Sequence, residues 1–105
     1  MIENIFENNA LISIILFYII GSIPFAIVIS KIFSLPDPRS FGSNNPGATN
    51  VMRSGNKLAG FLTFLFDFMK GFIPIFVLKI YGIENLILCV FSIAIILGHI
   101  FSVFL

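Results

Sequence analysis

Apolar residues fill three long stretches of the chain, and most polar residues lie between the first two. The stretches cover approximately residues 10–30, 58–80 and 86–105. A helix rises about 1.5 Å per residue, so about twenty residues cross a hydrocarbon core of about 30 Å. The pattern predicts an all-α integral membrane protein, a single membrane domain in which each stretch forms one transmembrane helix.

The composition supports this interpretation. Hydrophobic residues make up 58% of the chain and charged residues 10%, whereas soluble proteins average about 45–50% and about 25%. A small soluble domain needs many polar groups to cover its surface, so lipid is the solvent that this chain fits. The net charge of +1 excludes a basic nucleic-acid-binding protein. The single cysteine, Cys89, cannot form an internal disulfide and is expected to be a packing residue.

The first apolar stretch could instead be a secretory signal peptide. Such a signal needs a positively charged segment followed by a shorter apolar region. The N-terminus carries Glu3 and Glu7, and the first basic residue is Lys31. A transmembrane helix is therefore the better interpretation.

Basic residues are concentrated in the polar connection at residues 31–57. Against one acid, Asp37, this loop holds four of them: Lys31, Arg39, Arg53 and Lys57. Cytoplasmic loops of membrane proteins carry an excess of Lys and Arg, so the loop is predicted to be cytoplasmic and the N-terminus to lie outside. The link at residues 81–85 is short, so the second and third helices are predicted to be antiparallel neighbours.

The loop contains a short predicted helix after a segment that includes Gly42. Asn45 is a favourable N-cap, Pro46 suits the first helical position and Gly55 can end the helix. These signals predict a helix over residues 46–54. Because the first N–H groups of a helix have no partner within it, its start is predicted to be an anion site.

Polar side chains around this predicted helix favour a phosphate-bearing ligand at the cytoplasmic face of the membrane. The Arg53 guanidinium at its far end suits bidentate contacts to phosphate. Ser43 offers a hydroxyl, and three residues offer amides: Asn44, Asn45 and Asn50. The alternative is a solvated connector, because loops rich in Gly, Pro, Ser and Asn are common.

Two charged residues lie near the centre of the second apolar stretch. Asp67 and Lys70 would each cost roughly 2.5–3.5 kcal/mol there. Three residues apart, they share a helix face and can pair with each other or with groups on other helices. The pair is either a structural ion pair between helices or part of a polar pocket that reaches the loop. Nearby, Gly71 is expected to allow close helix approach and Pro74 to kink the helix.

His99 lies near the predicted cytoplasmic end of the third stretch. It is either a structural residue or a catalytic one. With one His and one Cys and no acidic cluster, local ligands predict no metal site. The residue five positions later is Phe104, so the His-x₄-Asp pattern of the soluble and peripheral glycerolipid acyltransferases is absent.

Residues 42–53 read G-S-N-N-P-G-A-T-N-V-M-R. This segment resembles the motif G-S-G-N-P-G-A-T-N-V-x-R of the bacterial acyl-phosphate-dependent glycerol-3-phosphate acyltransferases, and three further segments resemble other motifs of that family. Residues 21–25 read G-S-I-P-F, as in the family. Residues 67–71 match D-x-x-K-G, and residues 98–105 are similar to G-H-x-F-P-V-F-L. The order and spacing make the resemblance specific, and it covers nearly the whole chain.

The resemblance implies a multi-pass enzyme of about seven helices in the bacterial cytoplasmic membrane, of which this chain would be the N-terminal part. The family transfers an acyl group from acyl phosphate to the 1-hydroxyl of sn-glycerol 3-phosphate, without a cofactor or metal. The products are lysophosphatidic acid and phosphate. The residues implied to be catalytic are Ser43, Arg53 and His99. Those implied to bind substrate or its phosphate groups are Gly42, Asn45, Gly47, Thr49 and Asn50.

Acyl phosphate is already activated, so positioning and charge stabilisation can supply most of the rate. Arg53 and the loop amides are expected to hold phosphate oxygens. Ser43 is expected to hydrogen-bond a phosphate or the reacting hydroxyl. A covalent intermediate on Ser43 is the less favoured alternative, because no base is identifiable nearby.

The sequence departs from the family pattern in three respects. Asn44 stands in place of a motif glycine, and Asn tolerates a positive φ better than most residues. Ser102 stands in place of a proline. The family's G-G-K-G motif and its later motif with a His and an Asn do not occur in residues 1–105. The chain is therefore expected to be a truncated or split enzyme, acting with a missing C-terminal half or as an oligomer. The alternatives are a non-enzymatic assembly or transport subunit and a phosphate-binding regulator.

Overall fold

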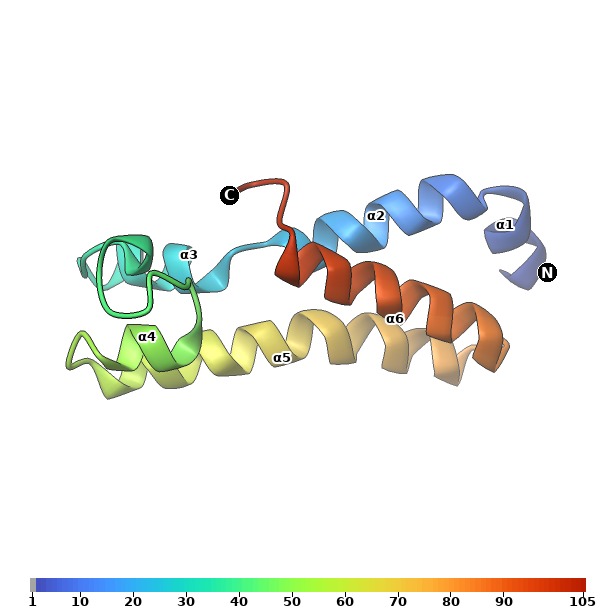
Figure 1. Cartoon of the computed structure of the whole chain (residues 1–105). Coiled ribbons are helices and arrows are strands. Elements are labelled where there is room, and N and C mark those ends of the chain that lie inside the picture. Colours follow the sequence, from blue (N-terminus) through green and yellow to red (C-terminus); the bar gives the residue numbers. More distant parts are fainter. Residues whose placement is uncertain (1) are drawn as a thin grey trace. The chain divides into compact units, whose positions relative to one another are not determined.

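The computed structural model describes residues 2–105, with side chains from Asn4 onward, and this part of the chain is helical without a β-strand. The prediction of an all-α protein is confirmed. The helices, of which the α-helices are labelled in Figure 1, are α1 (Ile2–Asn8), α2 (Ala10–Ser22), α3 (Phe25–Ile32), the 3₁₀ helix η1 (Pro38–Ser40), α4 (Ala48–Met52), α5 (Lys57–Ile80) and α6 (Asn85–Ile100).

The chain forms two compact units. One consists of the residues up to Ile23 together with Met69–Leu105, and the other of Pro24–Phe68. Helix α5 contributes residues to both units and continues through Pro74 as one helix. The kink expected at Pro74 stays a prediction.

The first unit packs α2, α6 and the C-terminal part of α5 around an aromatic core. Phe17 of α2 stacks on Phe91 of α6, with ring centroids 4.5 Å apart, and both rings are buried. Ile75 and Leu78 of α5 pack against the same core. The part of α5 that belongs to this unit and α6 run in opposite directions (Figure 1), joined by a turn in which Gly82 has φ +80°. The predicted antiparallel pair is confirmed.

Two glycines bring the backbones of α2 and α6 into contact. A Cβ atom at Gly98 would lie 2.1 Å from the carbonyl oxygen of Tyr18, and one at Gly21 would lie 2.0 Å from that of Ile95. A Cβ at Gly71 would lie 3.8 Å from the Ile95 side chain, which is ordinary packing. The close approach expected at Gly71 therefore occurs at Gly21 and Gly98 instead.

The first predicted span is not one continuous helix. Helix α2 ends at Ser22 and α3 begins at Phe25, with Ile23 in an extended conformation at ψ 115°. Pro24 causes the break, because proline lacks an N–H and disfavours helical geometry in the residue before it. The two helices together still form one apolar stretch, Ala10–Ile32, of 23 residues.

The third predicted span is shorter than expected. Two stretches, Ala10–Ile32 and Lys57–Ile80, are long and apolar enough to cross a membrane, whereas α6 has 16 residues and would cover only about 24 Å. Helix α6 ends at Ile100, and the next residue, Phe101, has the non-helical angles φ −117° and ψ 60°. The hydroxyl of Ser102 then donates a hydrogen bond to the carbonyl oxygen of Ser22. Residues 101–105 were predicted to be helical, and this was wrong.

The second unit is built around small and branched side chains beneath the loop. Its buried core consists of Ala26, Ile29, Val51 and Ala59, contributed by α3, α4 and the start of α5. This packing fixes α4 against the helices that precede and follow the loop. The loop predicted to carry the chemistry is therefore anchored through Val51, which is fully buried.

Candidate functional site

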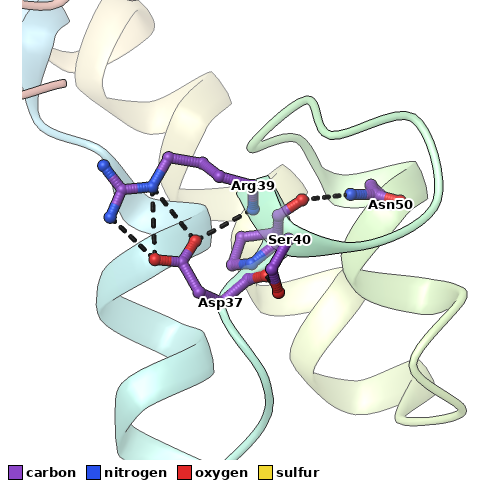
Figure 2. Close-up of polar contacts among 5 residues, drawn as sticks. Asp37, Arg39, Ser40 and Asn50 are labelled. Carbon is purple, nitrogen blue, oxygen red and sulfur yellow. Dashed lines mark hydrogen bonds and ion pairs between the residues drawn. The ribbon is translucent and has the colours of Figure 1, made fainter.

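Asn50 lies at the centre of the loop in the second unit. The residue is only 2% exposed. Its Nδ2 atom donates hydrogen bonds to the carbonyl oxygens of Pro38, at 2.6 Å, and Phe41, at 3.1 Å, and Figure 2 shows its side chain directed at the segment that contains η1. Asn50 thereby ties α4 to η1 and the residue after it.

The side-chain oxygen of Asn50 brings two predicted catalytic residues together. It accepts hydrogen bonds from the backbone N–H of Ser43, at 3.3 Å, and from Nη1 of Arg53, at 3.5 Å. Ser43 and Arg53 are themselves exposed. Asn50 thus holds the Arg53 guanidinium and the backbone of Ser43 close together. The guanidinium and the Ser43 hydroxyl can both donate hydrogen bonds to an anionic oxygen group.

The backbone around Ser43 requires two residues with positive φ. Gly42 has φ +56° and Asn44 has φ +60°. A Cβ atom at Gly42 would lie 2.1 Å from Oδ1 of Asn50. The positive φ of residue 44 is a backbone conformation that few residues other than glycine adopt, and asparagine is one that tolerates it. This is the condition under which Asn44 was expected to replace the glycine of the family motif.

The helix predicted from Asn45 is shorter than expected. Helix α4 begins at Ala48, and its N-cap is Gly47 at φ −129° and ψ 167°. The N–H of Asn45 donates to Oγ of Ser43 at 3.3 Å, and its carbonyl oxygen accepts from the N–H of Gly47 at 2.9 Å. Residues 45–47 thus form a turn before the helix, so the predicted N-cap at Asn45 and the helix start at Pro46 were wrong.

The end of α4 agrees better with the prediction. Arg53 is the C-cap residue, and its N–H donates to the carbonyl oxygens of Thr49 and Asn50. Gly55 follows with φ +93°, and its N–H donates to the carbonyl oxygen of Met52 at 3.0 Å. Thr49 is exposed on the helix between these ends.

An ion pair between Asp37 and Arg39 lies within the loop and was not predicted. Arg39 donates from Nη2 to Oδ2 of Asp37 at 2.7 Å and from Nε to both carboxylate oxygens (Figure 2). Its backbone N–H also donates to Oδ1 at 2.9 Å. These hydrogen bonds, the side-chain ones first, lower the pKa of Asp37 to about 2. Asp37 is the N-cap of η1 and is followed by Pro38. An aspartate followed by proline is a sequence signal for the start of a helix, and it could have identified this N-cap.

Lys70 and His99 meet in the first unit. Nζ of Lys70, a residue only 9% exposed, lies 3.0 Å from Nδ1 of His99 and donates to the carbonyl oxygen of Ile23 at 3.0 Å. Asp67 lies on the same helix, three residues before Lys70. The pairing of Asp67 with Lys70 stays a prediction. The contact of Lys70 with the helix break was not predicted, because it joins residues that are 47 positions apart.

The two groups of predicted residues belong to different units. Ser43, Asn50 and Arg53 are brought together in one unit, while Lys70 and His99 are brought together in the other. Among the described residues, no group of three or more His, Cys, Asp or Glu could hold a metal ion.

Comparison with known proteins identifies the family. Residues 11–105 match the sequence profile of a family described as glycerol-3-phosphate acyltransferase. The chain belongs to the glycerol-3-phosphate acyltransferase family. The match includes both groups of candidate residues, from the helix break at Ile23 to His99.

Individual members of the family are closely similar to this chain. The glycerol-3-phosphate acyltransferase of Methylobacillus flagellatus is 50% identical over 97 residues, which cover 92% of this chain and 49% of that protein. The one from Herminiimonas arsenicoxydans is 49% identical over 104 residues, covering 91% of this chain and 51% of that protein.

A solved structure shares the fold. It is the crystal structure of PlsY (YgiH), described as an integral membrane glycerol 3-phosphate acyltransferase, in its glycerol 3-phosphate form. The TM-score is 0.77 at 44% identity, and the match covers 91% of this chain and 48% of that one. The chain therefore spans about half the length of the acyltransferase family members that it matches.

Proposed function

We propose that this chain contributes to acyl transfer from acyl phosphate to the 1-hydroxyl of glycerol 3-phosphate, giving lysophosphatidic acid for phospholipid synthesis. The observation that carries the proposal is the convergence of Ser43 and Arg53 on the buried amide of Asn50. Membership of the acyltransferase family supports it. A site that only needs to hold phosphate groups and align two reactants requires donors of this kind in fixed positions.

Arg53 is proposed to hold phosphate oxygens. Its guanidinium presents donors in a planar fork that matches phosphate geometry. Asn50 accepts from Nη1, which restrains the side chain and leaves its other donors for a ligand. Gly42, Asn45, Gly47 and Thr49 are proposed to shape and line the same phosphate site.

Ser43 is proposed to hydrogen-bond a phosphate or the reacting hydroxyl. Its Oγ accepts a hydrogen bond from the N–H of Asn45 at 3.3 Å, so the hydroxyl hydrogen can be donated to a ligand. A backbone N–H is a donor and cannot take the proton of Ser43. This supports a positioning role over a covalent intermediate. His99 is proposed to act in the same reaction.

We propose three spans in the bacterial cytoplasmic membrane, with the N-terminus outside and residues 31–57 in the cytoplasm. The support is the excess of basic residues in that loop. Single cysteines placed by Glu7→Cys and Lys57→Cys, each in a Cys89→Ser background, test the sides on which the N-terminus and the loop lie. A membrane-impermeant maleimide should label the first in intact cells and the second only after permeabilisation. The reverse pattern would overturn the topology.

The transfer reaction is tested with labelled glycerol 3-phosphate and acyl phosphate in membranes that contain residues 1–105. One arm supplies this chain alone, and the other adds the remaining half of the Methylobacillus flagellatus relative. Ser43→Ala and Arg53→Ala are the matched variants, with chain abundance checked by immunoblot. Labelled lysophosphatidic acid that both variants lose supports the proposal, and the two arms show whether a second half is needed. No product in either arm, with both chains abundant, would overturn it. Phosphate binding without turnover would instead indicate a regulator.

A further inference from the structure

The Nζ atom of Lys70 that contacts His99 also binds the helix break in the first apolar stretch. In a continuous helix, the carbonyl oxygen of Ile23 would accept from the N–H of residue 27. Here the N–H of Ile27 donates to the carbonyl oxygen of Pro24 at 3.0 Å. Ile23 is therefore left with a carbonyl oxygen that needs another donor. The Nζ atom of Lys70 supplies it at 3.0 Å.

The same Nζ atom also lies 3.0 Å from Nδ1 of His99. A lysine ammonium group has three hydrogens to donate and no lone pair to accept with. One hydrogen is directed to Ile23, and the 3.0 Å distance from Nζ to Nδ1 places another at the imidazole. Nδ1 must then accept the hydrogen bond, and a neutral imidazole that accepts at Nδ1 carries its hydrogen on Nε2.

We propose that Lys70 is a positioning residue that holds His99 in the tautomer that carries its hydrogen on Nε2. His99 is exposed, so that N–H can be offered to a ligand. Because Nδ1 is engaged by an ammonium group and Nε2 already carries hydrogen, His99 is a hydrogen-bond donor and not a general base. The role of this donor in acyl transfer rests on the proposed function, whereas the hydrogen-bond geometry of Lys70 and His99 does not.

The chain contains one histidine, which makes the test direct. The full chain is produced with ¹⁵N-labelled histidine and placed in lipid bilayers or micelles at mildly alkaline pH. Two-bond nitrogen–proton correlation then identifies the nitrogen that carries hydrogen. One species with hydrogen on Nε2 and a hydrogen-bonded Nδ1 is expected. Hydrogen on Nδ1, or a mixture of both forms, would overturn the inference.

Substitutions separate the effect of Lys70 from that of the fold. Lys70→Met should shift the Nδ1 resonance of His99, because the donor is lost, and Lys70→Arg should largely restore it. Lys79→Met, an exposed site on the same helix, is the matched control and should leave the resonance unchanged. An unchanged Nδ1 resonance in Lys70→Met would overturn the proposal. If Lys70→Met fails to fold, the comparison of Lys70→Arg with the unsubstituted chain decides, since a guanidinium must also leave Nδ1 as the acceptor.

These measurements need no substrate, so the two proposals can fail separately. A chain without transferase activity that shows hydrogen only on Nε2 would contradict the proposed function and support this inference. An active chain with hydrogen on Nδ1 would do the opposite. His99→Gln adds a functional comparison, because glutamine keeps a donor near the position of Nε2 whereas His99→Ala does not. Activity retained in the first variant and lost in the second is expected of a donor.

Discussion

The backbone nitrogen of Ser43 lies 3.3 Å from Oδ1 of Asn50, a buried amide seven residues later in the chain. Asn50 was expected to bind the ligand itself. Its two amide hydrogens are instead directed to the carbonyl oxygens of Pro38 and Phe41. The residue thus organises the loop from within, and its predicted direct contact with substrate stays a prediction.

Removing the Asn50 side chain should open the loop. Asn50→Ala leaves the Pro38 and Phe41 carbonyl oxygens and the Ser43 N–H without this partner, which costs roughly 1–3 kcal/mol. We expect the hydrogen exchange of the Ser43 N–H to accelerate roughly fivefold or more. Asn45→Ala, at an exposed position in the same loop, is the control and should have little effect. Equal exchange rates in the two variants would contradict the role assigned to Asn50.

Adding a methyl group at Gly42 should disturb the hydrogen bonds by which Ser43 and Arg53 both bind Asn50. The new Cβ would lie 2.1 Å from Oδ1 of Asn50, while a Cβ at Gly55 would meet nothing within 4 Å. Both glycines have positive φ, so Gly42→Ala and Gly55→Ala share a backbone penalty of order 1 kcal/mol. Only Gly42→Ala should also release the Arg53 side chain, seen as line narrowing of its guanidinium NMR signals. Equal spectra for the two variants would show that the contact with Asn50 does not restrain Arg53.

The contact between α2 and α6 should depend on Gly98. A Cβ there would overlap the carbonyl oxygen of Tyr18 at 2.1 Å, so Gly98→Ala must push the helices apart and should cost roughly 1–3 kcal/mol. Gly71→Ala places its Cβ 3.8 Å from Ile95 and should be tolerated. Unfolding in mixed micelles with increasing denaturing detergent measures both. A Gly71→Ala variant as unstable as Gly98→Ala would argue against the close helix contact.

Acid should weaken the Asp37–Arg39 pair. Hydrogen bonds from Arg39 lower the pKa of Asp37 to about 2, compared with about 3.9 in an unfolded chain. A lowered pKa means that the pair stabilises the fold above about pH 4 and loses this contribution as the pH falls from about 4 to about 2. The effect should be small, because the pair is exposed. In NMR titrations of the folded chain, the Arg39 N–H resonance should move with a midpoint near the lowered pKa of Asp37, about 2, and Asp37→Asn should abolish the movement.

The sequence predicted helices well where long apolar runs decided the outcome, and less well where neighbouring local signals competed. The same pattern of a capping residue followed by proline occurs at Asp37–Pro38 and at Asn45–Pro46. Only Asp37 caps a helix, because its side chain accepts from the N–H of Arg39. The Asn45 backbone is held in a turn by Ser43 and Gly47. Local preference alone could not separate these two cases.

Pro24 is a helix-breaking residue that the sequence shows, but the long apolar run around it led to the prediction of one continuous helix. A strongly hydrophobic stretch predicts a span and says little about continuity within it. The hydrogen bond from Lys70 to the carbonyl oxygen of Ile23 could not be predicted, because the two residues are far apart in the sequence. The loop residues Ser43, Asn50 and Arg53, in contrast, lie close together in sequence, and this is why their association could be anticipated.

The distance in sequence between Ile23 and Lys70 has a consequence for biosynthesis. The carbonyl oxygen of Ile23 is made 47 residues before the ammonium group that binds it. An unsatisfied backbone carbonyl costs several kcal/mol in hydrocarbon, so the break at Ile23 would be less stable in lipid before α5 has been synthesised. We therefore expect a nascent chain that stops before residue 70 to remain extractable from the membrane far more readily than the finished one.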